Sequence, residues 1–133
     1  MKKCLADTNF YLRFILQDNS RQVQEVEKYL QKARAGQLEI VFLNEVILEM
    51  EFVLKKVYLT PKEKIIKALA VLFKTEYLAV QNRELWLEAI KIYQEKNLDF
   101  FDIFLFLKAQ KEKAEVLSFD KDFQKLAKSF KGA

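Results

Sequence analysis

Four acidic side chains occupy positions at which carboxylates could do chemistry. The first and last follow short apolar stretches near the two ends of the chain, and the middle two lie inside apolar helical patterns; they are Asp7, Glu49, Asp102 and Asp120. Oxygen ligands of this kind suit Mg²⁺ or Mn²⁺, ions that keep coordination positions open for water and a substrate phosphate. If the carboxylates converge, they predict a metal-dependent enzyme that acts on phosphate esters.

Asp102 gives the sharpest signal. It lies in a stretch, residues 99–107 (DFFDIFLFL), that is apolar almost all round a helix and is therefore expected to be buried. A lone ionised carboxylate in such surroundings costs several kcal/mol unless something compensates it. No basic residue lies within one helical turn on either side, so a bound cation is the natural compensation.

The other three acids also have ordinary structural explanations. Asp is a favoured N-cap residue, and Asp7 and Asp120 both stand directly before predicted helices. Glu49 is expected beside the apolar stripe of its helix, with Glu51 and Lys55 on the polar face. A boundary glutamate whose carboxylate reaches water fits that position equally well. The stripe consists of Val46, Met50, Val53 and Val57.

The composition excludes several other kinds of chemistry. The chain has no histidine, which removes Ser-His-Asp and Cys-His catalysis and every His-ligated zinc site. Its only two glycines, Gly36 and Gly132, cannot form a P-loop or a dinucleotide-binding loop. The single cysteine, Cys4, lies in a predicted strand, where we expect a buried and inert thiol. Carboxylates are therefore the leading catalytic candidates.

The length predicts one small domain, and the charge is compatible with a polyanionic partner. The 133 residues, of which 51% are hydrophobic, suffice for a single domain over residues 1–133, with a basic tail at about 127–133 that is expected to fray. The net charge of +4 is compatible with nucleic acid. The sequence shows neither a targeting segment nor an apolar run that could span a bilayer, so we expect a cytoplasmic protein that does not bind a membrane.

The order of the elements predicts an α/β fold. Strands are expected at residues 2–6, 38–43, 77–80 and 115–119. Helices are expected to begin at Asp7-Thr8-Asn9, Asp18-Asn19-Ser20, Asn44, Thr60-Pro61, Asn82, Asp99 and Asp120. Strands separated by helices imply a parallel sheet with helices on both faces. Ligands bind beyond the carboxyl ends of such strands, which is where Asp7 and Asp120 fall.

Four segments, taken in order, resemble the motifs of PIN-domain ribonucleases of the VapC type. The segments are ADTNFYLR (6–13), VILEMEFVL (46–54), LDFFD (98–102) and LSFDKDF (117–123). Each motif alone is weak, but the four occur in the family's order in a chain of the right length. The resemblance runs from Lys3 to about Leu126, so it covers nearly the whole chain.

This resemblance implies a fold, a site and a biological role. The fold is the PIN-domain three-layer sandwich, a short parallel sheet flanked by helices. The four acids named above hold one or two Mg²⁺ or Mn²⁺ ions, supported by hydrogen bonds from Asn9 and Ser118. A metal-activated water attacks an RNA phosphodiester and leaves a 5′-phosphate. The protein is expected to form a homodimer and to be the toxin that a cognate VapB-type antitoxin silences.

Other polar or charged residues near the motifs are weaker candidates for the site. Thr8, Asp99 and Asp122 could assist the metal site, although capping explains the two aspartates better. Glu45 stands one turn before Glu49 but fits the motif less well. Four cations could contact phosphate, but solvated surface charges are the better interpretation; they are Arg13, Lys55, Lys56 and Arg83.

Three alternatives stay open. The chain could be a PIN-like module that binds RNA or protein without catalysis. It could be a housekeeping RNA-processing nuclease rather than a toxin. It could be a phosphoacceptor receiver domain, which has a similar size. That class requires paired acids after the first strand, an acceptor Asp at the end of a middle strand and a lysine after the last strand, whereas the second acid here lies inside a predicted helix.

Overall fold

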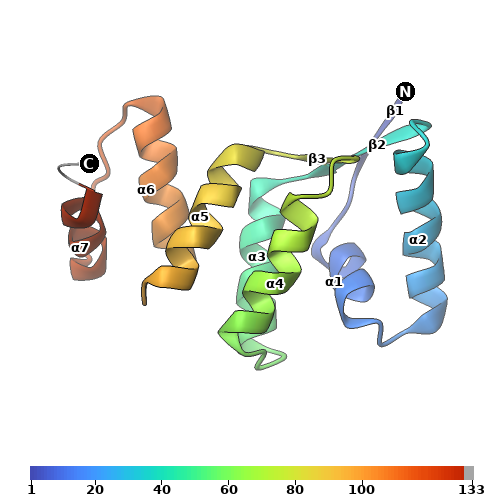
Figure 1. Cartoon of the computed structure of the whole chain (residues 1–133), viewed down its shortest axis with the longest axis horizontal. Coiled ribbons are helices and arrows are strands. Elements are labelled where there is room, and N and C mark those ends of the chain that lie inside the picture. Colours follow the sequence, from blue (N-terminus) through green and yellow to red (C-terminus); the bar gives the residue numbers. More distant parts are fainter. Residues whose placement is uncertain (131–133) are drawn as a thin grey trace. The chain divides into compact units, whose positions relative to one another are not determined.

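The computed structural model describes residues 1–130 (Figure 1). The elements are, in chain order, β1 (Lys2–Leu5), α1 (Thr8–Leu16), α2 (Ser20–Arg34), β2 (Leu38–Phe42), α3 (Asn44–Lys56), α4 (Lys62–Phe73), β3 (Leu78–Val80), α5 (Arg83–Glu95), α6 (Phe100–Glu112) and α7 (Lys121–Phe130). The chain divides into two compact units, Met1–Arg83 and Glu84–Ala133. The expectation of one domain over residues 1–133 stays a prediction.

A short parallel sheet lies in the first unit. Its strand order is β1-β2-β3, with Cys4 paired with Ile40 and Ile40 paired with Leu78. The central strand β2 buries every second residue and half-buries those between, because neighbouring strands and helices enclose it. Parallel strands flanked by helices confirm the predicted α/β fold. The carboxyl ends of the strands are followed by polar residues: Asp7, Asn44 and Gln81.

Aromatic and aliphatic side chains fill the core of the first unit. The ring of Tyr11 stacks on that of Phe42 with centroids 4.0 Å apart, and Phe42 in turn lies 6.4 Å from Phe73. Helix α1 contacts both α2 and α3, and α3 contacts α4. Burial of this apolar surface is the main force that holds the helices on the sheet. The core is completed by Leu12, Ile47, Met50, Leu54, Ile65 and Leu69.

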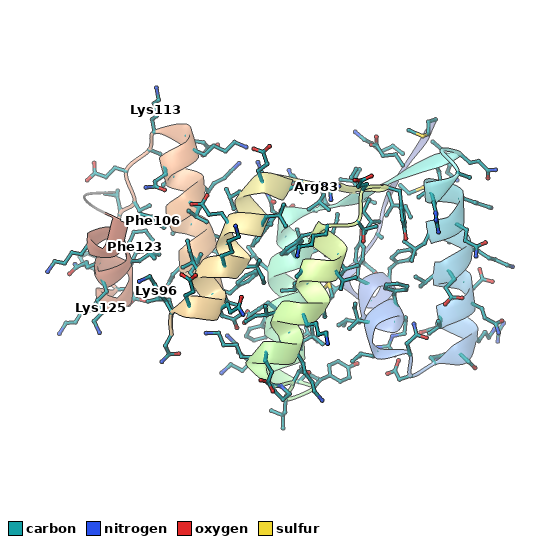
Figure 2. All side chains as sticks on the ribbon, viewed as in Figure 1. Arg83, Lys96, Phe106, Lys113, Phe123 and Lys125 are labelled. Carbon is teal, nitrogen blue, oxygen red and sulfur yellow. The ribbon has the colours of Figure 1, made fainter. Side chains whose placement is uncertain are left out.

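In the second unit, a fully buried tryptophan organises the packing. The indole ring of Trp86 on α5 stacks on Phe104 at 4.6 Å and on Phe100 at 5.3 Å, both on α6. The rings of Phe106 and Phe123 meet edge to face at 6.0 Å between α6 and α7 (Figure 2). Within residues 1–130, no helix is long and apolar enough to cross a membrane.

Three of the seven predicted helix starts are confirmed by capping hydrogen bonds. The side chains of Asp7, Asn19 and Asp99 accept from backbone N–H groups in the first turns of α1, α2 and α6. Gly36 has φ of 77° just after α2, a conformation that glycine adopts without steric cost. The capping residues and Gly36 therefore marked the starts of these three helices and the end of α2 correctly.

The predicted fourth strand is wrong. Residues 114–120 have no regular structure, and Leu117 and Phe119 are 87% and 104% exposed. A strand is held by hydrogen bonds to a neighbouring strand, and the sheet ordered β1-β2-β3 does not include this segment. Helix α7 extends to Phe130. Residues 131–133, where the predicted frayed tail ends, lie outside the described residues.

Candidate active site

Asp7 stands at the carboxyl end of β1 and caps α1. Its Oδ1 accepts a hydrogen bond of 3.0 Å from the backbone N–H of Phe10, and the carboxylate is exposed. The capping interpretation of Asp7 is therefore confirmed. Capping uses one carboxylate oxygen and leaves further lone pairs on the group, so the same side chain can also bind a cation. Thr8 is buried in the first turn of α1, and Asn9 is exposed there.

An open cavity of about 420 Å³ adjoins Asp7 within the first unit. Its wall is mostly apolar, and its two charged side chains are Lys2 and Asp7. Cys4 also lines it and is half-buried, so the expectation of a buried thiol was only partly right. Phe10 and Tyr29 contribute rings, with centroids 6.4 Å apart. The cavity therefore adjoins one of the four candidate acids.

Glu49 lies on the exposed face of α3, together with Glu45 and Phe52. The sequence had placed it beside a buried stripe, and that placement was wrong. The buried face of the helix is formed by Asn44, Ile47, Met50, Glu51 and Leu54. The helix is rotated from its predicted orientation, because apolar residues occur almost all round it and its packing partners select which of them are buried. Glu49 is consequently accessible to solvent.

The same rotation buries Glu51, which had been assigned to the polar face. Glu51 is only 5% exposed, and its Oε2 lies 3.1 Å from the Nζ of Lys55 one turn later. An ionised carboxylate at this depth requires such a partner, because its desolvation is costly. Lys55 therefore neutralises an acid within the protein and is not a solvated surface charge.

Asp102 lies in the first turn of α6 and is half-buried. Its helix buries Phe100, Ile103 and Phe106, in agreement with the predicted apolar surroundings. The carboxylate benefits from the helix dipole at this end. Asp99 is the N-cap and accepts from the N–H of Phe101 at 2.9 Å, so its capping role is confirmed.

Asp120 is exposed directly before α7 and is tied to Ser118. The Oγ of Ser118 accepts a hydrogen bond of 3.0 Å from the backbone N–H of Asp120. The Asp120 carbonyl accepts from the N–H of Gln124 and so starts the helix. This contact joins Ser118 to the Asp120 backbone, and the supporting role expected for Ser118 in a metal site stays a prediction. The side chain of Asp122 lies outside the described residues.

The four predicted acids have the oxygen ligands that a hard cation prefers. The structure does not show these acids gathered at one place. Mg²⁺ and Mn²⁺ prefer oxygen ligands, which all four predicted acids supply. Among the side chains that the structure describes, which do not include that of Asp122, no group of three or more acids or thiols is gathered closely enough to hold a metal ion. The joining of the four acids into one site stays a prediction.

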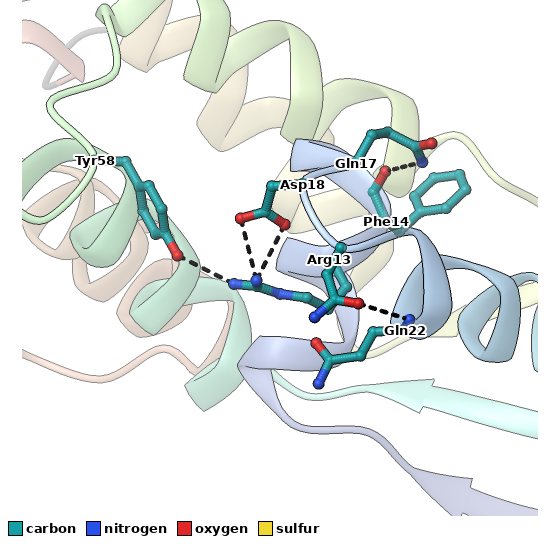
Figure 3. Close-up of polar contacts among 7 residues, drawn as sticks. Arg13, Phe14, Gln17, Asp18, Gln22 and Tyr58 are labelled. Atoms are coloured by element: carbon teal, nitrogen blue, oxygen red, sulfur yellow. Dashed lines mark hydrogen bonds and ion pairs between the residues drawn. The ribbon is translucent and has the colours of Figure 1, made fainter.

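Two arginines that had been considered for phosphate contacts are engaged inside the first unit. Figure 3 shows Arg13, whose Nη1 donates to both carboxylate oxygens of Asp18 at 3.0 and 3.1 Å, while its Nη2 donates to the hydroxyl of Tyr58 at 3.1 Å. This ties α1 to the end of α3. Arg83 (Figure 2) donates to the carbonyls of Phe73, Thr75 and Leu78. Neither guanidinium is a solvated surface charge.

Sequence reasoning missed a polar junction at the ends of β2 and β3. Asn44 had been predicted as an N-cap, but it is the first residue of α3, and Leu43 stands at the cap without a side-chain bond. The side chain of Asn44 instead donates to Oδ1 of Asn82 at 2.8 Å, and its backbone N–H donates to Oε1 of Gln81 at 2.8 Å. The partners lie 37 and 38 residues away, so no local pattern signals them.

Comparison with known proteins agrees with the ordered motifs. A family model described as the PIN domain matches residues 4–129. A VapC ribonuclease from Aquifex aeolicus (strain VF5) is 28% identical over 123 residues, which cover 92% of this chain and 90% of that protein. No solved structure matches the chain. Because the family model matches residues 4–129 of the 133, including all four acid-bearing segments, the chain belongs to the PIN-domain family.

Proposed function

We propose that this chain is a metal-dependent endoribonuclease and the toxin of a VapBC-type pair. The observation that carries the proposal is the family match over residues 4–129, which takes in all four acids. The similarity to a VapC ribonuclease along most of both chains supports the choice of RNA as substrate. The positive net charge of +4 favours a polyanion.

In this proposal, Asp7, Glu49, Asp102 and Asp120 together hold Mg²⁺ or Mn²⁺. The bound ion would lower the pKa of a water molecule and offset charge on the scissile phosphate. Ser118 holds the backbone at Asp120 through its 3.0 Å hydrogen bond. Asn9, exposed two residues after Asp7, would position that side of the site by hydrogen bonding. The cavity beside Asp7 would receive the substrate.

The partners proposed for the chain follow from the same similarity. A VapB-type antitoxin would bind the nuclease and silence it, a second copy of the chain would form a homodimer with it, and cleavage would take place in the cytoplasm. Expression of the chain alone should then arrest growth. The Asp102→Asn variant should not arrest growth, and normal growth on expression of the wild-type chain would count against the toxin role.

Cleavage of RNA by the purified chain tests the enzymatic proposal. Total tRNA and ribosomal RNA are incubated with Mg²⁺, Mn²⁺ or EDTA, and the products are resolved on denaturing gels. We expect discrete products that require metal and disappear in Glu49→Gln. Glu45→Gln is a matched control, because Glu45 is exposed one turn earlier on the same helix. RNA binding without cleavage by a folded, metal-supplied protein would instead support the silent binding module.

A further inference from the structure

Helix α3, which carries Glu49, lacks a local cap. Leu43 occupies its N-cap position, and no side chain of the preceding loop bonds to the first turn. The first backbone N–H groups of a helix have no partners within the helix and must find them elsewhere. A helix that begins at the end of a strand without a cap is poorly fixed at that end, unless a distant part of the chain supplies the bonds.

Residues that follow β3 supply one of those bonds and a second one to the Asn44 side chain. We name Asn44, Gln81 and Asn82 the strand-end junction. Oε1 of Gln81 accepts from the backbone N–H of Asn44 at 2.8 Å and so caps α3 from another strand. Oδ1 of Asn82 accepts from Nδ2 of Asn44, also at 2.8 Å, and Asn44 is only 9% exposed. Hydrogen bonds at such depth are costly to lose, because the separated groups stay away from water.

The backbone that presents these two side chains is itself fixed on both sides. The N–H of Gln81 donates to the carbonyl of Phe42 at 3.0 Å, which continues the β2–β3 pairing. Asn82 has φ of 54°, in the left-handed region that asparagine tolerates better than most residues. The next residue, Arg83, donates hydrogen bonds to three backbone carbonyls, which lie at the end of α4, just after it, and at the start of β3.

We propose that the strand-end junction is a positioning device for the nuclease site and that Asn82, which accepts from the Asn44 side chain, is a positioning residue within it. The inference rests on the proposed function, because it concerns where the Glu49 carboxylate stands. Glu49 makes no ion pair within residues 1–130, so its location depends on the helix that carries it. It lies about 7.5 Å along the helix axis from Asn44, and a tilt of about 10° there would move it by about 1.3 Å. Displacements near 1 Å can reduce catalysis by about 100-fold.

Two substitutions of Asn82 separate the hydrogen bond from the backbone conformation. Asn82→Gly keeps the positive φ without strain but removes the acceptor for Asn44. Asn82→Asp keeps an acceptor oxygen and the tolerance of positive φ. Thr75→Ala is the control: it removes another hydrogen bond, the 2.7 Å bond from Thr75 Oγ1 to the Val71 carbonyl, outside α3.

Amide hydrogen exchange and steady-state kinetics are measured on the full chain. In Asn82→Gly we expect first-turn amides of α3 to exchange at least about 10-fold faster, and kcat to fall about 10-fold or more with KM for RNA unchanged. Asn82→Asp should restore both, and Thr75→Ala should change neither. The double variant Asn44→Ala/Asn82→Gly should lose no more than the worse single variant, because both break the same bond.

Each remaining outcome decides a separate question. Faster exchange in Asn82→Gly with wild-type kcat would show a purely structural junction and overturn the positioning role. Unchanged exchange with reduced kcat would overturn the proposed route through α3. A wild-type chain that cleaves no RNA would refute the proposed function alone, and the exchange comparison would still confirm or refute control of α3 by the junction.

Discussion

Replacing Asp7 by Asn and by Ala separates its capping role from its proposed metal-binding role. The cap is a single exposed hydrogen bond of 3.0 Å to the N–H of Phe10. Asn caps a helix about as well as Asp, so Asp7→Asn should change the free energy of unfolding by less than about 0.5 kcal/mol. Asp7→Ala loses the cap and should cost about 1 kcal/mol. For a chain of this size, that is a fall in melting temperature of about 4 °C.

The response to metal then identifies the second role. A ligand at 100 times its dissociation constant stabilises the folded state by about 2.7 kcal/mol, so saturating Mg²⁺ or Mn²⁺ should raise the wild-type melting temperature by about 10 °C. Neither variant should show this rise, and RNA cleavage should fall at least about 100-fold in both.

Thermal unfolding followed by circular dichroism, in EDTA and in Mg²⁺ or Mn²⁺, gives the melting temperatures. RNA cleavage is measured on the same protein samples. Equal melting temperatures for Asp7→Asn and Asp7→Ala in EDTA would refute the prediction that the cap stabilises the folded chain. Wild-type cleavage by Asp7→Asn would refute the metal-binding role.

Three further predictions concern the framework of the site. Arg83→Ala should lower the free energy of unfolding, measured in urea, by about 2–4 kcal/mol, because three carbonyls lose a charged donor. A urea midpoint like that of the wild type would contradict a stabilising role for these three hydrogen bonds. Trp86→Ala should cost about 3–5 kcal/mol, followed by circular dichroism, because the fully buried indole packs on two rings; a loss under about 1 kcal/mol would contradict its core role. Burial raises the pKa of Tyr11, so the stability it contributes is present below about pH 10 and is lost as the pH rises further, because the unfolded chain ionises first. Tyr11→Phe should therefore flatten the decline in melting temperature above about pH 10, and an unchanged slope would show that other groups cause it.

Local signals in the sequence were sufficient for much of the framework. Asp7, Asn19 and Asp99 marked helix starts correctly, because a capping side chain acts on amides two or three residues away. The apolar runs at residues 38–43 and 77–80 became β2 and β3, because alternation and β-branched residues suit strands within a sheet. The candidate acids were chosen in the same way, but in the described part of the chain no strand directly precedes Asp120, and Glu49 is exposed, so their role as one site stays a prediction.

Features that depend on distant partners were beyond local reasoning. Helix α3 carries apolar residues on most of its circumference, so its periodicity allowed more than one buried face, and the packing chose the one that includes Glu51. Asn44 looked like a local cap and instead bonds to Asn82. Residues 115–119 have the composition of a strand, but a strand also needs a neighbour to accept its hydrogen bonds.

Binding of Mn²⁺ tests most directly the proposal that Asp7 and Asp102 are both metal ligands. Calorimetric titration is performed on the wild-type chain, on Asp7→Asn, on Asp102→Asn and on the control Glu45→Gln. We expect either aspartate substitution to weaken Mn²⁺ binding at least about 10-fold, while the control binds like the wild type. Mn²⁺ binding that is unchanged in Asp102→Asn would contradict the proposal.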